Sequence, residues 1–273
     1  MKTSFSQAEK LAMFSFAMTL LLLFFSYGLA VIPLVVFLCC CLIAPFLPQW
    51  GFFLPIISKS QTGSKGIALT FDDGPTPETT SKILELLASY NMKATFFVIG
   101  EKAKKYPELI RKILEAGHTI GNHSWKHDSL LMLRSQKKLH IDIHKCQQLL
   151  SSFGVRPLLF RPPVGITNSL LNKVLQKENL QTVTFSCRAF DGGNRKIASL
   201  AERILKKLKT GDILLLHDLP PQKEVAVSVL LKELTILFDT LKKNDLKVIP
   251  LEELIAAPVM THLDKEEHGN NCH

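Results

Sequence analysis

Residues 11–57 include no Asp, Glu, Lys or Arg. A single helix of that length would be about 70 Å long at roughly 1.5 Å per residue, more than twice the ~30 Å hydrocarbon core of a bilayer. Two shorter spans fit better, near 11–26 and 29–46, with a tight turn at 26–28. We therefore expect residues 1–57 to form a transmembrane helical hairpin that anchors the rest of the chain.

A cleaved secretory signal is the main alternative for this segment. Lys2 and Lys10 would be its basic region and residues 11–25 its apolar core. No A-x-A-like cleavage site follows, and the apolar stretch continues well past the usual length of such a core, which favours an uncleaved anchor. Lipid attachment at Cys39 is disfavoured because the bulky Leu38 precedes it.

Charge and cysteine content indicate which side of the membrane the remaining chain occupies. Both ends of a two-span hairpin share a side, and the flanking lysines favour the cytoplasmic face of an inner or cytoplasmic membrane. These lysines are Lys2, Lys10, Lys59 and Lys65. The cysteines outside the apolar segment are odd in number and lack a disulfide-framework spacing: Cys146, Cys187 and Cys272. One span plus a re-entrant piece would place the domain outside, and that alternative stays open.

The formal net charge is +9, and much of it comes from lysines on predicted helices. Examples are Lys102, Lys104, Lys105, Lys206, Lys207 and Lys209. Such runs usually form solvated helix faces, although they also attract anionic lipid headgroups or a phosphorylated substrate. The sequence contains no nucleic-acid motif and no aromatic interleaving among the basic residues, so we do not expect DNA or RNA binding.

After the apolar segment, short apolar runs alternate with longer stretches of helical period. We expect a polar linker at 58–65, one domain at 66–260 and a polar, disordered tail at 261–273 that includes His268 and His273. The predicted strands are 67–71, 94–99, 118–122, 158–160, 182–187, 212–216 and 247–250. The predicted helices are 78–90, 107–116, 136–152, 169–177, 198–208 and 225–243. About seven β/α repeats in some 200 residues predict a parallel, closed or nearly closed (β/α)7 barrel.

Polar side chains collect at the ends of these predicted strands. The positions are Asp72, Asp73, His123, His127, Arg161, Asp191 and His217. Each one alone has an ordinary explanation, such as an Asp-Gly-Pro turn or a histidine in the core. Together they would meet at the carboxyl end of a parallel barrel, where apolar residues would serve packing better. Their convergence predicts a functional site.

One carboxylate and two imidazoles form a three-ligand site typical of a catalytic zinc or similar divalent ion. His123 and His127 have i, i+4 spacing, and they lie on one face if this segment begins a helix. The other Asp of the 72–73 pair would then be free to act as a general base, held ionised by Arg161. His217 can donate a proton, with Asp191 to orient its ring. This set is complete for hydrolysis of a small amide or ester.

These residues resemble a known family, the polysaccharide deacetylases, also called the NodB-homology domain or carbohydrate esterase family 4. The likeness spans about residues 67–250 and rests on four segments. TFDDGP at 70–75 resembles the first motif, and H-S-W-K-H at 123–127 is similar to H-[ST]-x-x-x-H. R-P-P-V-G at 161–165 is similar to R-x-P-x-G, and L-L-H at 215–217 matches L-x-H. The resemblance implies a distorted (β/α) barrel.

The resemblance also implies a role for each position. Asp72 would be the catalytic base, held by Arg161, and His217 the catalytic acid, oriented by Asp191. The implied metal ligands are Asp73, His123 and His127. The implied acyl-pocket and oxyanion residues are Leu215 and Val164, the latter through its backbone N–H.

Two segments depart from the family pattern. Val164 stands where the family often has an aromatic residue, a change that leaves the backbone N–H in place. The fourth motif, usually D-x-x-D-W, is R-A-F-D-G at 188–192, so the orienting Asp191 remains but the pocket Trp is missing. Arg188 adds a cation where the family often has an acid. We therefore expect chitin and bulk peptidoglycan to be poorer substrates than the family pattern alone implies.

The function predicted from these observations is metal-dependent removal of an N-acetyl or similar small N-acyl group from an amino sugar. The substrate would be a glycan, peptidoglycan or lipid-linked saccharide, with a lipid-linked or phosphorylated glycan at the bilayer surface favoured. The predicted cofactor is one divalent ion, zinc first, with cobalt, manganese or nickel as alternatives. Two other hypotheses are a catalytically silent glycan-binding or membrane scaffold module on the same barrel, and a non-haem iron oxygenase.

Overall fold

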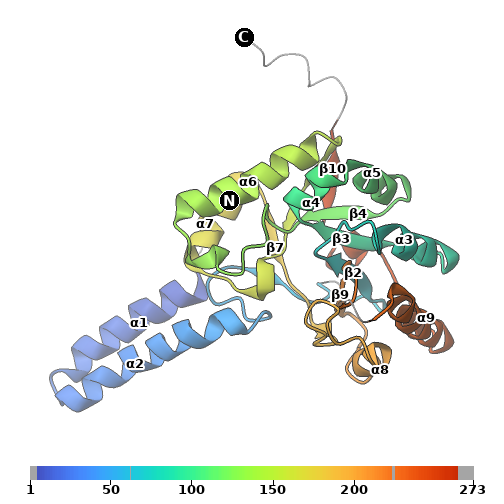
Figure 1. The fold of residues 1–273 in the computed structure, drawn as a ribbon. Helices are drawn as coiled ribbons and strands as arrows, with labels where there is room; N and C mark the ends of the chain where they lie inside the picture. The colour runs from blue at the N-terminus through green and yellow to red at the C-terminus, as the bar shows by residue number, and fades with distance from the viewer. Residues whose placement is uncertain (1–4, 62, 223–224, 264–273) are drawn as a thin grey trace, which may run out of the picture.

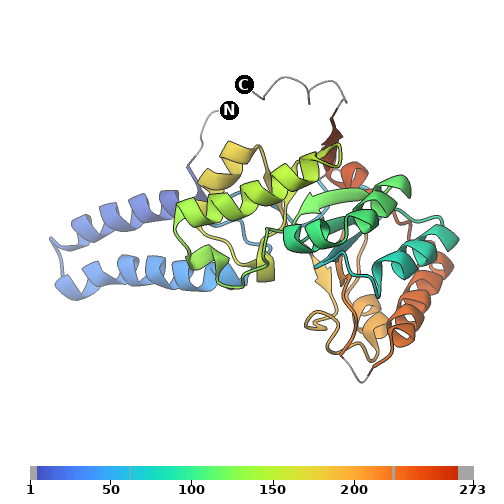
Figure 2. The same ribbon diagram turned by 45° about the horizontal axis from the view of Figure 1, so that its top comes forward.

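The fold is that of a computed structural model, which describes residues 5–61, 63–222 and 225–263. Lys2, Cys272, His268 and His273 lie outside the described residues. At the N-terminal end, α1 (Gln7–Leu22) and α2 (Tyr27–Ile43) form a helical hairpin. It projects from the side of the molecule that carries α6 (Gln136–Ser151) and α7 (Ser169–Glu178), as Figures 1 and 2 both show.

Local sequence signals define both ends of the hairpin helices. At the start of α1 the Ser6 hydroxyl accepts the Glu9 N–H and the Glu9 carboxylate accepts the Ser6 N–H, which is a capping box. The turn lies at 23–26 and not at the predicted 26–28. The reason is that Ser26 is the extended N-cap of α2, so Gly28 already lies inside that helix.

The hairpin surface is apolar. Phe24 and Phe25 in the turn are 87% and 76% exposed, and most large apolar side chains of both helices are also exposed. Among the described residues, the segment Tyr27–Phe46 is long and apolar enough to cross a membrane, a property shared by anchors and signal sequences. The 16 residues of α1 would extend about 24 Å, short of the ~30 Å hydrocarbon core. The N-terminal segment is therefore an apolar helix pair that fits a signal or a membrane anchor.

Beyond the hairpin, eight strands form one parallel, curled sheet in the order β1-β7-β6-β4-β3-β2-β9-β8. They are β1 (Ile56–Ile57), β2 (Ala68–Asp72), β3 (Ala94–Val98), β4 (Thr119–Asn122), β6 (Leu159–Phe160), β7 (Gln181–Val183), β8 (Cys187–Arg188) and β9 (Ile213–His217). β7 and β8 belong to one run of chain, yet β7 pairs with β6 and β8 pairs with β9. This run therefore joins the two sides of the sheet into a nearly closed, distorted barrel.

Helices cover the outer face of the barrel (Figure 1). They are α3 (Thr80–Ser89), α4 (Gly100–Lys105), α5 (Pro107–Glu115), α6, α7, α8 (Leu200–Leu205) and α9 (Val227–Lys243). The short helix α10 (Leu251–Ile255) packs instead against the interior cluster that includes Ala68 and Leu215. Three short 3-10 helices lie at Ala44–Phe46, Leu131–Leu133 and Pro163–Gly165. An antiparallel pair, β5 (Val155–Pro157) and β10 (Met260–His262), lies outside the main sheet.

Alternation along the buried strands assigns residues to the two sides of the barrel wall. In β2, Leu69 and Phe71 join the core beneath the helices, whereas Ala68 joins a separate core inside the barrel. In β9, Leu214 and Leu216 likewise face the helices and Leu215 the interior. Since side chains alternate with period two, Asp72 and His217 fall on the interior side at the strand ends. The strand pattern itself thus delivers two polar groups to the barrel mouth.

Several predicted elements have different bounds. The strand expected at 247–250 is a single parallel bridge between Ile67 and Val248, because α10 begins directly after Pro250. The strand expected at 182–187 is divided into β7 and β8, because its two ends pair with different neighbours. The sequence analysis did not anticipate β1, which makes the residues just after the hairpin part of the barrel.

The predicted linker and tail also differ from the structure. Within residues 58–65, Lys59 forms an antiparallel bridge with Asp212, so this segment is tied to the barrel. The chain continues past 260 as β10, which pairs with β5, and the part of the predicted tail at 264–273 lies outside the described residues.

Candidate active site

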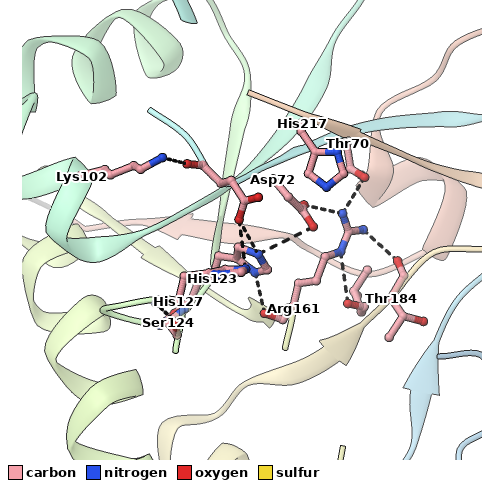
Figure 3. A network of polar contacts seen from close by, with 12 residues as sticks. Thr70, Asp72, Lys102, His123, Ser124, His127, Arg161, Thr184 and His217 are labelled. Atoms are coloured by element: carbon pink, nitrogen blue, oxygen red, sulfur yellow. Dashed lines mark hydrogen bonds and ion pairs between the residues drawn. The ribbon is translucent and has the colours of Figure 1, made fainter. Parts of the chain in front are cut away.

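Strand register places the first two polar groups side by side. β2 and β9 are neighbours in the sheet, and Asp72 is the register partner of His217. The Asp218 N–H donates to the Asp72 carbonyl oxygen at 2.8 Å, which continues this pairing beyond the strand ends. The predicted base and the predicted acid therefore come from adjacent positions at the carboxyl edge of the barrel, as Figure 3 shows.

A buried guanidinium holds the Asp72 carboxylate. Arg161 is 1% exposed, and its Nη1 donates to Asp72 Oδ1 and to Thr70 Oγ1, both at 2.7 Å (Figure 3). Its Nη2 donates to the Thr184 carbonyl at 2.8 Å, and its Cζ lies 4.0 Å from the centre of the Phe97 ring. This charge-assisted bond fixes the orientation of the carboxylate inside the barrel.

Asp73 turns away from Asp72 because its backbone is left-handed, with φ of 71°. A β-carbon at the next residue, Gly74, would lie 2.2 Å from an Asp218 carboxylate oxygen, so only glycine fits there. Asp218 is fully buried and accepts hydrogen bonds from the hydroxyls of Thr79 and Thr80 at 2.5 and 2.6 Å. Burial raises the pKa of Asp218 to about 6. This carboxyl supports the turn that points the two catalytic-site carboxylates in different directions.

Asp73, His123 and His127 face one another closely. The Asp73 Oδ1 atom lies 3.3 Å from His123 Nε2 and 3.1 Å from His127 Nε2. His123 Nδ1 is 2.8 Å from the Arg161 carbonyl, an acceptor, so Nδ1 carries the proton and Nε2 presents a lone pair. Burial alone would raise the pKa of Asp73, but the two imidazoles beside it hold that pKa well below its usual range.

This cluster fits a divalent cation. Asp73 Oδ1 is buried and has no hydrogen-bond partner in the described part of the chain, which is costly for a carboxylate. The carboxylate oxygen and the two ring nitrogens lie within 4.8 Å of one another, and one carboxylate with two imidazoles is a donor set that zinc-like ions favour. The residues predicted as metal ligands are thus brought together by the fold.

The two histidines do not lie on a helix, which corrects one expectation. Residues 123–127 form a loop in which Ser124 and His127 have φ of 70° and 55°. The His127 N–H donates to the Ser124 hydroxyl at 2.9 Å, and the Ser124 N–H donates to Asn122 Oδ1 at 2.8 Å. Side chain–backbone bonds compete here with helix formation, and the resulting turn points both rings at Asp73.

His217 and Asp191 form the second polar pair at the barrel mouth. His217 Nδ1 lies 3.0 Å from Asp191 Oδ2, and that oxygen also accepts the Asn194 N–H at 2.9 Å. Burial alone would lower the pKa of His217, but the Asp191 carboxylate raises it overall. Burial opposes ionisation of Asp191, yet its bond to His217 keeps the Asp191 pKa below normal. The pair is arranged as an imidazole held by a carboxylate, with Nε2 free for a reacting group.

A cavity of about 580 Å³ opens over these groups. Leu215 and Val164 line it, and Val164 is 54% exposed with φ of 53°. The altered fourth segment contributes Arg188 and Phe190, and the Arg188 Cζ lies 4.2 Å from the centre of the Phe190 ring. Phe190 thus supplies an aromatic surface on this side of the cavity, which lacks the family's Trp.

The base of the hairpin contacts the same rim. The Thr184 hydroxyl donates to the Pro48 carbonyl at 2.6 Å, while the Thr184 carbonyl accepts from Arg161. A β-carbon on Gly165 would lie 3.5 Å from Pro48 Cβ. The segment that leaves α2 therefore packs beside the 161–165 motif and reaches Arg161 through one residue.

Sequence reasoning missed several supporting residues. Lys102 donates to the Asp73 carbonyl at 2.7 Å, and Asn194 Nδ2 donates to the His217 carbonyl at 3.0 Å. Asp218 and Thr184 were also unassigned. The position of Asp218 could have indicated its role. It directly follows the strand-end residue His217, and a carboxyl group buried there is costly unless it has hydrogen-bond partners.

Comparisons with known proteins agree with this geometry. The family described as polysaccharide deacetylase matches residues 59–183. A peptidoglycan-N-acetylglucosamine deacetylase of Bacillus cereus is 36% identical over 193 residues, which are 70% of this chain and 88% of that protein. A peptidoglycan-N-acetylmuramic acid deacetylase of Bacillus subtilis is 34% identical over 183 residues, 67% of this chain and 38% of that protein.

A solved structure gives the same picture. The crystal structure of a peptidoglycan N-acetylglucosamine deacetylase superposes with a TM-score of 0.68 and 28% identity, covering 75% of this chain and 94% of that chain. The family match begins after the helical hairpin and ends at the last residue of β7. On this evidence the chain belongs to the polysaccharide deacetylase family, whose members named here are carbohydrate deacetylases.

Proposed function

We propose that this protein is a membrane-anchored, metal-dependent hydrolase that removes an N-acetyl or similar small N-acyl group from an amino sugar. The observation that carries the proposal is the convergence of three clusters on one cavity. These are the triad Asp73, His123 and His127, the pair Asp72 and Arg161, and the pair His217 and Asp191. Base, acid and cation site are then all present, which argues against a catalytically silent barrel.

In the proposed reaction, Asp72 takes a proton from the attacking water, whose oxygen bonds to the amide carbon. When bound by Asp73, His123 and His127, a divalent ion supplies Lewis acidity and lowers the pKa of water at the site. The Val164 backbone N–H would stabilise the developing oxyanion, and Leu215 would contact the acyl methyl group. Zinc is the expected ion, with cobalt, manganese or nickel as alternatives.

Collapse of the tetrahedral species requires a proton on the departing nitrogen. His217 Nε2 would deliver that proton as the carbon–nitrogen bond breaks, giving the carboxylic acid and a free amino sugar. Asp191 would stabilise the imidazolium and fix its ring, while Arg161 would hold the Asp72 carboxylate in position through its hydrogen bond. An iron oxygenase would have no use for this acid and base, and the relatives named above are hydrolases.

The contacts of the hairpin support a substrate held at the bilayer surface. Pro48, at the exit of the apolar segment, is bonded to Thr184 on the cavity rim. Arg188 and Arg195 also line the cavity, and no described acidic residue forms an ion pair with either of them. An amino sugar that carries a phosphate or is linked to a lipid would suit a cationic cavity beside a membrane anchor. We therefore favour such a substrate over polymeric peptidoglycan.

The proposed organisation follows from the same features. Residues 1–57 would form the anchor, with the catalytic domain at 66–260 on the cytoplasmic face, where Lys10, Lys59 and Lys65 flank the apolar segment. Placement on the outer face is the alternative, and it would bring the cavity to peptidoglycan. Protease accessibility of the barrel in intact cells and in permeabilised cells separates the two.

Acetate release by the full-length chain in detergent, reconstituted with zinc, tests the proposal. The substrates are acetylated oligosaccharides, peptidoglycan fragments and lipid-linked acetylated amino sugars, and the control is Asp72→Asn with its zinc content measured. We expect release that depends on Asp72 and is fastest with the lipid-linked substrates. Absence of release by zinc-loaded, folded wild-type protein on every substrate would favour the silent module. Faster release from peptidoglycan fragments would overturn the substrate preference alone.

A further inference from the structure

A second cluster of one carboxylate and two imidazoles lies away from the active site, between α6 and α7. His140 and His144 are one helical turn apart on α6, and Glu178 is the last residue of α7. Glu178 Oε1 lies 2.7 Å from His140 Nε2 and 3.0 Å from His144 Nδ1. None of the three lines the catalytic cavity.

Glu178 is buried beside the two histidines. Its side chain is 8% exposed, and it sits at the C-terminal end of a helix, where the backbone dipole repels negative charge. In the described part of the chain its ion-pair partners are these two histidines, and no Lys or Arg pairs with it. The described contacts of this carboxylate are therefore ring nitrogens, the type of donor that zinc-like ions favour.

The packing of the two helices sets the spacing of the cluster. Leu139 and Ile143, which precede the two histidines on α6, are fully buried against Leu171, Val174 and Leu175 of α7. The i, i+4 spacing brings the two imidazoles over the same carboxylate, with ring centres 5.5 Å apart. The side chains of His140 and His144 are 38% and 44% exposed, so an ion and its waters can reach them from solvent.

We propose that His140, His144 and Glu178 form a second divalent metal site, separate from the catalytic one, for zinc or another late first-row ion that favours imidazole. The three donor atoms already lie within 4.8 Å of one another. Ligands about 2.1 Å from a tetrahedral zinc lie roughly 3.4 Å apart, so binding needs only a small opening of two half-exposed rings. Each ring proton that faces Glu178 moves to the other ring nitrogen when the ion binds.

A bound dication would balance the Glu178 charge at the end of α7 and join α7 to α6. Both helices lie on the side of the barrel from which the hairpin projects (Figures 1 and 2). Leu54, in the segment that leads from the hairpin into β1, packs in the same apolar cluster as these helices. The site would therefore stabilise the part of the barrel that supports the anchor, without contributing to the chemistry at Asp72.

Metal stoichiometry of the full-length chain in detergent tests this site. Metal-free protein is dialysed against buffered zinc, and bound zinc is measured by mass spectrometry. We expect about two equivalents per chain in the wild type and about one in His140→Ala/His144→Ala, with deacetylase activity retained. The matched control is His262→Ala, which removes an exposed histidine on β10 and should leave both equivalents bound.

A complementary variant removes the catalytic ligands and leaves the second site. Asp73→Asn/His127→Ala should still bind about one equivalent of zinc, and adding His144→Ala should abolish it. Because His144 is nearly half exposed, its replacement is compatible with folding, which circular dichroism verifies. If the wild type binds about one equivalent, or if loss of His140 and His144 leaves the stoichiometry unchanged, the cluster is a hydrogen-bonded contact only and the proposal fails.

Discussion

The two sides of the catalytic cavity differ in how deeply their polar residues are buried and paired. The metal side comprises Asp72, Asp73, His123, His127 and Arg161. The loop side comprises Arg188, Phe190, Asp191 and His217. On the metal side Asp72 and Arg161 are buried and pair with each other, so replacing either one leaves the other charge unpaired. On the loop side, Phe190 is 58% exposed and Arg188 stacks on aromatic rings, so both can vary at little cost to the fold.

The difference explains which motifs match the family and which depart from it. The metal side keeps the family's residues, whereas the loop side keeps Asp191 and His217 but replaces the neighbouring acid and Trp with Arg188 and Gly192. Under the proposed function, chemistry and specificity would be carried by separate parts of one cavity. Variable recognition residues commonly lie on loops held by a rigid scaffold.

The largest effect is expected on the metal side. Asp72→Asn should lower kcat by roughly 10²–10⁴-fold, because the base is lost while the side chain keeps its shape. Steady-state kinetics with the preferred acetylated substrate measures this, and bound zinc in the same samples should be unchanged. An activity within threefold of wild type would show that Asp72 is not the base.

Asp191→Asn tests whether Asp191, which lies on the loop side, affects proton transfer by His217. Burial alone would lower the pKa of His217, but Asp191 raises it, so this proposed acid stays protonated to higher pH in the wild type. Removing the carboxylate should lower that pKa and shift the alkaline fall of kcat to lower pH, with a loss of roughly 10–10³-fold at pH 7. A full pH–rate profile checks the direction. An unchanged alkaline limb would separate His217 from the proton-transfer step.

Sequence patterns predicted much of the barrel and of this site for identifiable reasons. Strands β2, β3 and β9 are short, mostly apolar and almost entirely buried, so their pattern is clear. Asp72 and His217 are the last residues of β2 and β9, and Asp73 directly follows β2, which is why their convergence could be predicted. Weakly patterned segments were less predictable. β1 and β8 have two residues each, and their pairing depends on distant parts of the chain.

The backbone conformation of the loops at the site could not be predicted from the sequence. The i, i+4 spacing of His123 and His127 predicted a helical start. Instead, backbone N–H groups donate to Asn122 Oδ1 and to the Ser124 hydroxyl, which gives a loop with left-handed residues. Asp73 has the same left-handed backbone, and the next residue, Gly74, lies against Asp218, a neighbour that is distant in sequence. In both places tertiary contacts override local preference.

Arg188→Ala should change specificity more than chemistry. If the loop side recognises an anionic group, the variant should lose about tenfold in kcat/KM on a phosphorylated or lipid-linked amino sugar, mostly through KM. Its activity on neutral chito-oligosaccharides should stay nearly constant. Arg156→Ala on β5 is the matched control, since it removes an exposed arginine that does not line the cavity. An equal loss on both substrate types would mean that Arg188 only supports the loop.

The smallest effect concerns the contact between the hairpin and the metal side. Thr184→Val removes the hydroxyl bonded to Pro48 but keeps the carbonyl that accepts from Arg161, so we expect a loss of about 1 kcal/mol in the free energy of unfolding. Thr182→Val is the matched control, because the buried Thr182 hydroxyl has no hydrogen-bond partner in the described residues and its removal should be neutral or stabilising. Thermal unfolding of both variants in detergent measures the difference.

The kinetic consequence of Thr184→Val decides whether the anchor influences catalysis. The Pro48 bond fixes the rim residue whose carbonyl holds the Arg161 guanidinium, and that guanidinium holds Asp72. A two- to fivefold fall in kcat for Thr184→Val, absent in Thr182→Val, would mean that the position of the hairpin is transmitted to the base. Equal kcat values would mean that the Thr184–Pro48 contact contributes to stability only. The residues of the metal side would then be unaffected by the position of the hairpin, as they are by changes in the variable loop.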